Sequence, residues 1–130
     1  MIASALPPAL NRSLTYYLSG PMSGYENFNY PAFHTAKEFL ELCGLSIESP
    51  HTNPWPQNHQ NMSAETLWQH MMRLCVMQME SCDGIILLRG WAHSRGARIE
   101  LDAMVKKSAP VYFFDELNHK VVDMNRAIAA

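Results

Sequence analysis

The chain has 130 residues, of which 48% are hydrophobic and 17% charged, and its formal net charge is −2. This length suits one domain with its own hydrophobic core. No stretch approaches the roughly 18 unbroken apolar residues of a membrane span, so no membrane association is predicted. No block of Lys and Arg residues is present that would bind along a nucleic-acid polymer, so no nucleic-acid partner is predicted.

Residues 1–13 come first and carry two adjacent prolines, Pro7 and Pro8, inside their apolar stretch. A secretory signal peptide would begin with a basic segment and continue with an uninterrupted apolar one. We therefore expect a flexible N-terminal arm and no export signal.

Short β-prone runs edged by Gly, Pro or Asp predict four strands, at residues 14–19, 45–48, 84–88 and 111–114. Between them, apolar residues recur at helical spacing in three stripes. The stripes are Phe33, Ala36, Leu40 and Cys43; Leu67, Met71 and Leu74; and Ala97, Leu101 and Met104.

This alternation of strand and helix predicts an α/β three-layer sandwich of the flavodoxin/Rossmann-like type. Its sheet is mostly parallel, with four to five strands and with helices on both faces. We expect the domain at residues 14–118, and a C-terminal edge strand at 120–123 with a tail within 119–130.

A tight turn follows the first strand and consists of Gly20, Pro21, Met22, Ser23 and Gly24. Ligands of open parallel sheets bind beyond the carboxyl ends of the strands, so this turn is a candidate binding element as well as a plain turn. It matches neither the G-x-G-x-x-G fingerprint nor the P-loop, which disfavours dinucleotides and nucleoside triphosphates.

Residues 49–62, with three prolines and three asparagines, exceed the usual connection length, so they are either a functional lid or a disordered loop. Residues 63–80 form a helix that is apolar over most of its circumference. One sheet face cannot cover such a helix, so we expect a homo-oligomer through residues 63–80, with coverage by the C-terminal tail as the alternative.

The segment GWAHSRGARIE, residues 90–100, follows the third strand. Ser94 is a good N-cap, and Gly96 lets the first helical turn approach an anion. Glu100 lies at the edge of the inward stripe, where burial would raise its pKa and suit it to attack a sugar carbon. The alternative is a surface glutamate paired with Arg98 or Lys107.

Four motifs in this order resemble the nucleoside 2-deoxyribosyltransferase-like superfamily, and most closely its uncharacterised phage and prophage branch. They are Tyr17-Leu-Ser-Gly-Pro-Met-Ser-Gly, Asn29-Tyr-Pro-Ala-Phe, Cys82-Asp-Gly-Ile-Ile-Leu-Leu-x-Gly-Trp and Ser94-x-Gly-Ala-x-x-Glu100. Together they span about residues 15–114. The resemblance implies a nucleoside or nucleotide ligand and a bacterial host cytoplasm.

The resemblance also implies roles for single residues. Glu100 matches the glutamate that attacks the anomeric carbon, and Tyr17 matches a tyrosine near the reacting sugar. Ser94 and Gly96 match the pair that holds a 5′-phosphate, and the turn at residues 20–24 would line the base or sugar pocket. Trp91 is a candidate for stacking on a base or for wedging its loop against a neighbour.

One position departs from the superfamily pattern. Where active members carry an aspartate, eight residues before Asp83, this chain has Cys75. A thiol holds no fixed negative charge and is most often a small buried apolar group. His93 could donate a proton in its place, although a solvent-facing loop histidine is the plainer interpretation.

Cys43, Cys75 and Cys82 form no C-x-x-C pair, and the histidines show no metal-ligand spacing, so we expect no metal or organic cofactor and a reducing cytoplasm. The leading hypothesis is cleavage or transfer of the N-glycosidic bond of a deoxynucleoside or its 5′-monophosphate. The alternative is a catalytically inactive protein that binds or sequesters a nucleotide.

Overall fold

The structure is a computed structural model, and it describes residues 6–125. The strands are β1 Thr15–Ser19, β2 Ser46–Glu48, β3 Gly84–Leu87, β4 Val111–Asp115 and β5 Lys120–Asp123. The α-helices are α1 Tyr30–Leu42, α2 Ala64–Glu80 and α3 Arg95–Lys106. Short 3-10 turns lie at η2 Glu26–Asn29, η3 Pro50–Thr52, η4 His59–Asn61 and η5 Trp91–His93. The predicted strand positions agree with these bounds to within one residue.

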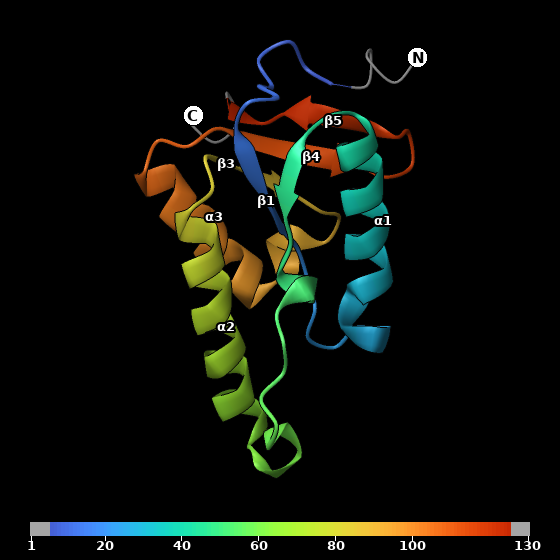
Figure 1. Cartoon of the computed structure of the whole chain (residues 1–130). Coiled ribbons are helices and arrows are strands. Elements are labelled where there is room, and N and C mark those ends of the chain that lie inside the picture. Colours follow the sequence, from blue (N-terminus) through green and yellow to red (C-terminus); the bar gives the residue numbers. More distant parts are fainter. Residues whose placement is uncertain (1–5, 126–130) are drawn as a thin grey trace.

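The five strands form one sheet in the order β2-β1-β3-β4-β5 (Figure 1). β1, β2, β3 and β4 run parallel to one another, and β5 runs antiparallel to β4 at the edge. The predicted α/β flavodoxin-like fold and the edge strand at Lys120–Asp123 are therefore confirmed. β1 and β3 lie side by side at the centre, where the chain connections diverge to opposite faces and a ligand crevice is expected.

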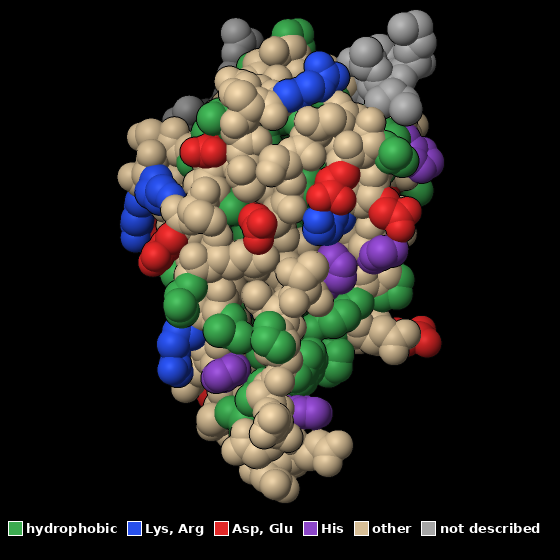
Figure 2. All heavy atoms as spheres, viewed as in Figure 1, with side chains coloured by type: hydrophobic (Ala, Val, Ile, Leu, Met, Phe, Trp, Pro, Cys, Tyr) green, Lys and Arg blue, Asp and Glu red, His purple; other side chains and the backbone are tan. Residues whose placement is uncertain are grey.

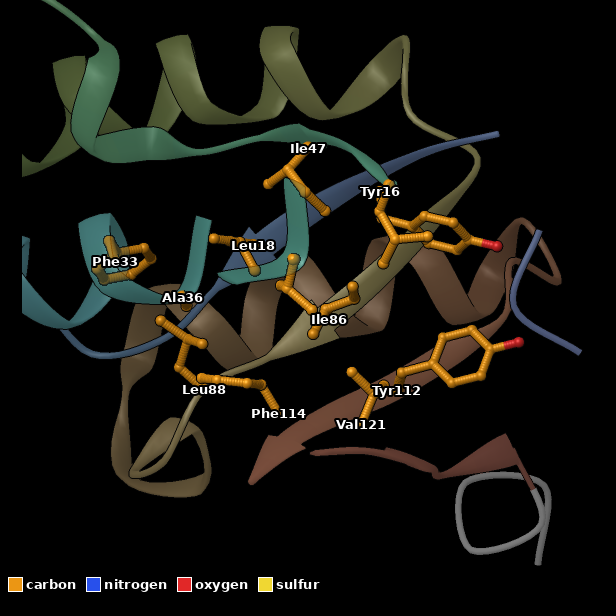
Figure 3. Close-up of a cluster of buried hydrophobic side chains, with 12 residues drawn as sticks. Tyr16, Leu18, Phe33, Ala36, Ile47, Ile86, Leu88, Tyr112, Phe114 and Val121 are labelled. Atoms are coloured by element: carbon orange, nitrogen blue, oxygen red, sulfur yellow. The ribbon is translucent and has the colours of Figure 1, made fainter. Parts of the chain in front are cut away.

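The two faces of the sheet are covered by different helices (Figure 1). α1 packs on one face, over a cluster that includes Tyr16, Leu18 and Ile86 (Figure 3). α2 and α3 pack on the other face, over a cluster that includes Tyr17 and Ile85. Because side chains alternate along a strand, Tyr17 and the buried Ser19 share the face of α2 and α3.

The N-terminal segment touches the domain in the part that is described. Leu6 and Leu10 pack against the α1-side cluster. Arg12 donates from Nε to the carbonyl oxygen of Cys43 at 3.0 Å. Residues 6–13 therefore make defined contacts with the domain. The expected flexible arm at residues 1–5 and the expected tail at residues 126–130 lie outside the described residues.

The segment 49–62, expected as a lid or a disordered loop, begins with packed residues. Ser49 and Pro50 are buried, and the Asn53 side chain donates to the Gln78 Oε1 of α2 at 3.0 Å. Two 3-10 turns, η3 and η4, interrupt the rest. The start of this segment is thus tied to α2, next to the carboxyl end of β2.

Within residues 6–125, no helix combines the length and the apolar character that crossing a bilayer requires.

Candidate functional site

The site is built around Glu100, which α3 carries over the central strand β1. Its side chain is only 4% exposed. Tyr17 donates its hydroxyl to Oε2 at 2.7 Å, and Ser19 donates to Oε1 at 2.6 Å. The expectation that Glu100 faces inward is confirmed, and the alternative of a surface pair with Arg98 or Lys107 is wrong.

The start of α3 explains why Glu100 faces inward. The Ser94 hydroxyl accepts from the backbone N–H of Ala97 at 3.2 Å, which confirms the predicted N-cap and sets the phase of the helix. Ala97, Leu101 and Met104 are buried on one stripe. Glu100 lies three residues after Ala97, so the helical period brings it onto the same inward stripe.

Burial dominates the electrostatics of this carboxyl group. It raises the pKa of Glu100 to about 7, although the donated hydrogen bonds from Ser19 and Tyr17 oppose the rise. Burial and the adjacent Glu100 charge raise the pKa of Tyr17 well above its usual 10. The phenol therefore stays protonated near neutral pH and remains a donor, while the carboxyl group changes charge there.

Cys75 lies beside this pair, on α2. It is buried, and burial together with the Glu100 charge raises its pKa to about 12. Asn53 Nδ2 donates toward its sulfur at 3.8 Å. The thiol is thus neutral at pH 7, and it cannot supply the charge of the aspartate expected at this position.

Sequence reasoning missed three polar residues of this region. Ser19 binds Glu100 directly, and its position two residues after Tyr17 on the same strand face could have identified it. Asn53 and Gln78 continue from Cys75 toward β2: Gln78 Nε2 donates to the Ser49 carbonyl oxygen at 3.0 Å and to Glu48 Oε1 at 2.9 Å. No sequence motif signals these two residues.

The turn at residues 20–24 lies against the end of β3. A Cβ at Gly20 would come within 2.9 Å of Leu88 Cβ, so close packing explains this glycine. Pro21 is buried, Met22 packs on the α1-side cluster, and Ser23 and Gly24 are exposed. These positions adjoin Ser19, but their expected contact with a base or sugar stays a prediction.

The loops after β1 and β3 touch each other. Gly90 has a φ of +89°, and a Cβ there would lie 2.8 Å from the Tyr25 hydroxyl and 3.1 Å from Pro21 Cγ. Trp91, next in sequence, is partly buried against the α2/α3-side cluster, as the wedge interpretation requires. Its stacking on a base stays a prediction.

Gly96 is explained by helix packing. A Cβ at this position would come within 3.0 Å of the Met72 sulfur of α2. Within residues 6–125, the backbone N–H groups of Arg95 and Gly96 have no protein acceptor, because the Ser94 hydroxyl takes only that of Ala97. Two free N–H groups therefore remain at the start of α3, where the helix dipole favours an anion.

Among the described residues, Asp83, Asp102 and His93 make no hydrogen bond or ion pair with Glu100. Asp83 accepts from the Thr15 backbone N–H at 2.9 Å and shapes the turn into β3. Asp102 pairs with Lys106 at 3.0 Å on the exposed side of α3. His93 is exposed.

A cavity of about 280 Å³ opens at the carboxyl edge of the sheet. It is lined by Tyr25, Asn29, Ala32, Leu88, Arg89, Gly90 and Glu116. None of Tyr17, Ser19 and Glu100 lines it. A ligand in this cavity would contact the loops after β1, β3 and β4, on the α1 side of the sheet, whereas Glu100 lies on the opposite side with α2 and α3.

A cluster of aromatic side chains, Phe28, Tyr30 and Trp55, was also missed by the sequence reasoning. Phe28 and Trp55 have ring centroids 4.8 Å apart, and Trp55 Nε1 donates to the Tyr30 hydroxyl at 2.8 Å. Asn27, Phe28 and Asn29 all have positive φ, which is costly for Phe28. The η2 turn holds the Phe28 side chain 46% exposed despite that cost.

Within residues 6–125, no three His, Cys, Asp or Glu side chains gather in a way that could hold a metal ion. No curated protein matches the chain. A family model does match, over residues 14–113, which is most of the chain and includes β1, β3 and the whole of α3. The chain therefore belongs to the DUF4406 family, a domain of unknown function.

Proposed function

We propose that the protein cleaves or transfers the N-glycosidic bond of a deoxynucleoside or a deoxynucleoside 5′-monophosphate. One observation carries the proposal: Glu100 is buried at 4% exposure, with both carboxylate oxygens held by the hydroxyls of Tyr17 and Ser19. The resemblance of four motifs to the nucleoside 2-deoxyribosyltransferase-like superfamily supports the choice of substrate.

In the first step, ionised Glu100 attacks the anomeric carbon with one carboxylate oxygen. The bond between that carbon and the base nitrogen breaks, and the base leaves with the bonding electrons and takes up a proton. Tyr17 and Ser19 fix the direction of attack. Because the neutral Cys75 thiol is a poor acid, the proton comes from water or from His93.

In the second step, water attacks the anomeric carbon of the glycosyl ester, the bond to the Glu100 oxygen breaks to restore the carboxylate, and the sugar leaves while the water proton passes to solvent. A second base in place of water gives transfer. The two displacements retain the configuration at this carbon. A 5′-phosphate would bind the free N–H groups of Arg95 and Gly96 at the start of α3, beside the Ser94 cap.

The test incubates the protein with each deoxynucleoside and each monophosphate, and free base is measured by chromatography. We expect base release from at least one substrate, and a loss of about a thousandfold or more in Glu100→Ala. kcat/KM should fall as pH drops below about 7, because attack requires the ionised carboxylate. Asp102→Ala is the matched control, since Asp102 is an exposed acid on the same helix.

The second candidate is a nucleotide-binding protein without catalysis, and the neutral thiol at Cys75 favours it. Saturable binding of a nucleotide in calorimetry, with no base released by any substrate, would support this candidate and contradict the enzyme. Base release gained in Cys75→Asp would identify the missing carboxylate as the cause. The expected cytoplasmic location stays a prediction under both candidates.

A further inference from the structure

A shallow apolar groove runs between α2 and α3 on the outer surface, away from the sheet, with a volume of about 570 Å³. We call it the α2 groove, and it is lined by Trp68, Gln69, Met72, Arg73, Val76, Met77, Glu80 and Ile99. Met77 is 62% exposed and Ile99 is 44% exposed. Figure 2 shows hydrophobic side chains gathered at the surface over α2 and the loop before it.

The groove exists because the sheet covers only a narrow stripe of α2. Cys75 and Met79 are the buried residues of this 17-residue helix. Trp68, Met72 and Val76 are only partly buried. A contiguous apolar surface of this kind commonly marks a protein interface.

The charges around the groove indicate what covers it. Arg73 and Glu80 lie seven residues apart, two turns along the same side of α2, and they flank Val76 and Met77 symmetrically. Within residues 6–125, neither of them makes an ion pair, whereas the third Asp, Glu, Lys or Arg residue of α2, Glu65 in its first turn, pairs with Arg95 at 2.9 Å. Within the described residues, the groove therefore offers one cation and one anion that lack an ion pair, placed on either side of Val76 and Met77 along α2.

This arrangement is self-complementary. If a second α2 lies antiparallel across the first, with a two-fold axis between Val76 and Met77, Arg73 of each copy faces Glu80 of the other. Val76 and Met77 of the two copies then meet at the centre, and the charges form the rim that protein interfaces usually show. Arg95, which stacks 3.7 Å above the Trp68 ring, extends this rim toward α3.

We propose that the chain forms a two-fold symmetric homodimer through the α2 groove, with Arg73 of each copy paired to Glu80 of the other. The occupant of the groove is thus a second copy of this chain. The proposal is independent of the glycosidic chemistry, because it rests on the outer face of α2 and not on the side that contacts Tyr17 and Glu100.

Charge reversal tests the dimer together with its register, with mass measured by sedimentation across a dilution series. We expect the unchanged protein to be a dimer. Arg73→Glu and Glu80→Arg should each weaken association at least about tenfold, because each places like charges opposite one another twice. An equimolar mixture of the two variants should recover the dimer mass, since every pair is then of opposite sign, and so should the double variant.

Glu38→Arg on α1 is the control, because it reverses an exposed charge on the opposite side of the sheet. It should leave the mass unchanged, and circular dichroism checks that all variants fold. The proposal is overturned if the unchanged protein stays monomeric throughout the series. It is equally overturned if the single reversals have no effect on the dimer, or if the mixture of variants remains monomeric.

Discussion

The two faces of the sheet carry different kinds of core. The face under α1 is packed with aliphatic and aromatic side chains, among them Tyr16, Leu18 and Phe33, and its buried cluster contains no charged residue (Figure 3). The face under α2 and α3 buries Glu100 with Tyr17, Ser19 and a thiol. The comparison teaches that one layer of this fold buries only uncharged side chains, whereas the other also buries a carboxyl group, whose loss of solvation costs stability when it is ionised.

The largest expected effect on stability lies on the α1 face. Phe33 is fully buried there, so Phe33→Ala should lower the free energy of unfolding by about 3–5 kcal/mol. Urea unfolding measures the change. The matched control is Phe113→Ala. Phe113 is only partly buried, on the opposite face, so its replacement should lower the free energy of unfolding by less. Equal losses in both variants would contradict the division between the two faces.

The next effect concerns the pH dependence of stability. The pKa of Glu100 is about 7 in the folded state against an ordinary 4.5, so the folded protein keeps a proton that the unfolded chain has released between these values. Stability should therefore fall as pH rises through this window, by about 3 kcal/mol in total.

Glu100→Gln removes this contribution while preserving the size of the side chain. Unfolding of both proteins is measured by urea at several pH values, and the difference between them isolates Glu100 from the other carboxylates. The excess stability of the unchanged protein over the variant should be greatest below pH 4.5 and should decline up to about pH 7. If the free energies of unfolding of the two proteins changed with pH in parallel, the carboxyl group of Glu100 would be exposed to water in the folded protein.

A smaller effect is expected from removing the Tyr17 hydroxyl, and it distinguishes Tyr17 from its neighbour Tyr16. Tyr17→Phe removes a hydrogen bond that lowers the pKa of Glu100, so the midpoint of the pH profile of kcat/KM should move upward. Base release should also fall about tenfold, the cost of one hydrogen bond to a charged group. Tyr16→Phe is the matched control, since the Tyr16 hydroxyl accepts from the Asn11 backbone and faces α1. Identical behaviour of the two variants would remove Tyr17 from the site.

Much of the fold could be predicted, because strand and helix periods are local. The alternation of short apolar runs with helical stripes was enough for the mostly parallel sheet, and residues 120–123 were recognised as an edge strand. The inward position of Glu100 also followed from its phase relative to Ala97, Leu101 and Met104. Gly20 and Gly96 were recognised as close approaches, and in the structure they pack against Leu88 and Met72; their contact with a ligand stays a prediction.

The sequence by itself determined the layers, the positions of the strands and helices and the inward position of Glu100, since these depend on residue spacing along the chain. Only the tertiary structure decided that Ser19 shares the carboxylate with Tyr17, that Asn53 reaches Cys75, and that the loops after β1 and β3 enclose a cavity without Glu100. Such contacts join residues that lie far apart in the sequence, for example Ser19 and Glu100. Their geometry is set by how the helices pack on the sheet, and no local pattern encodes it.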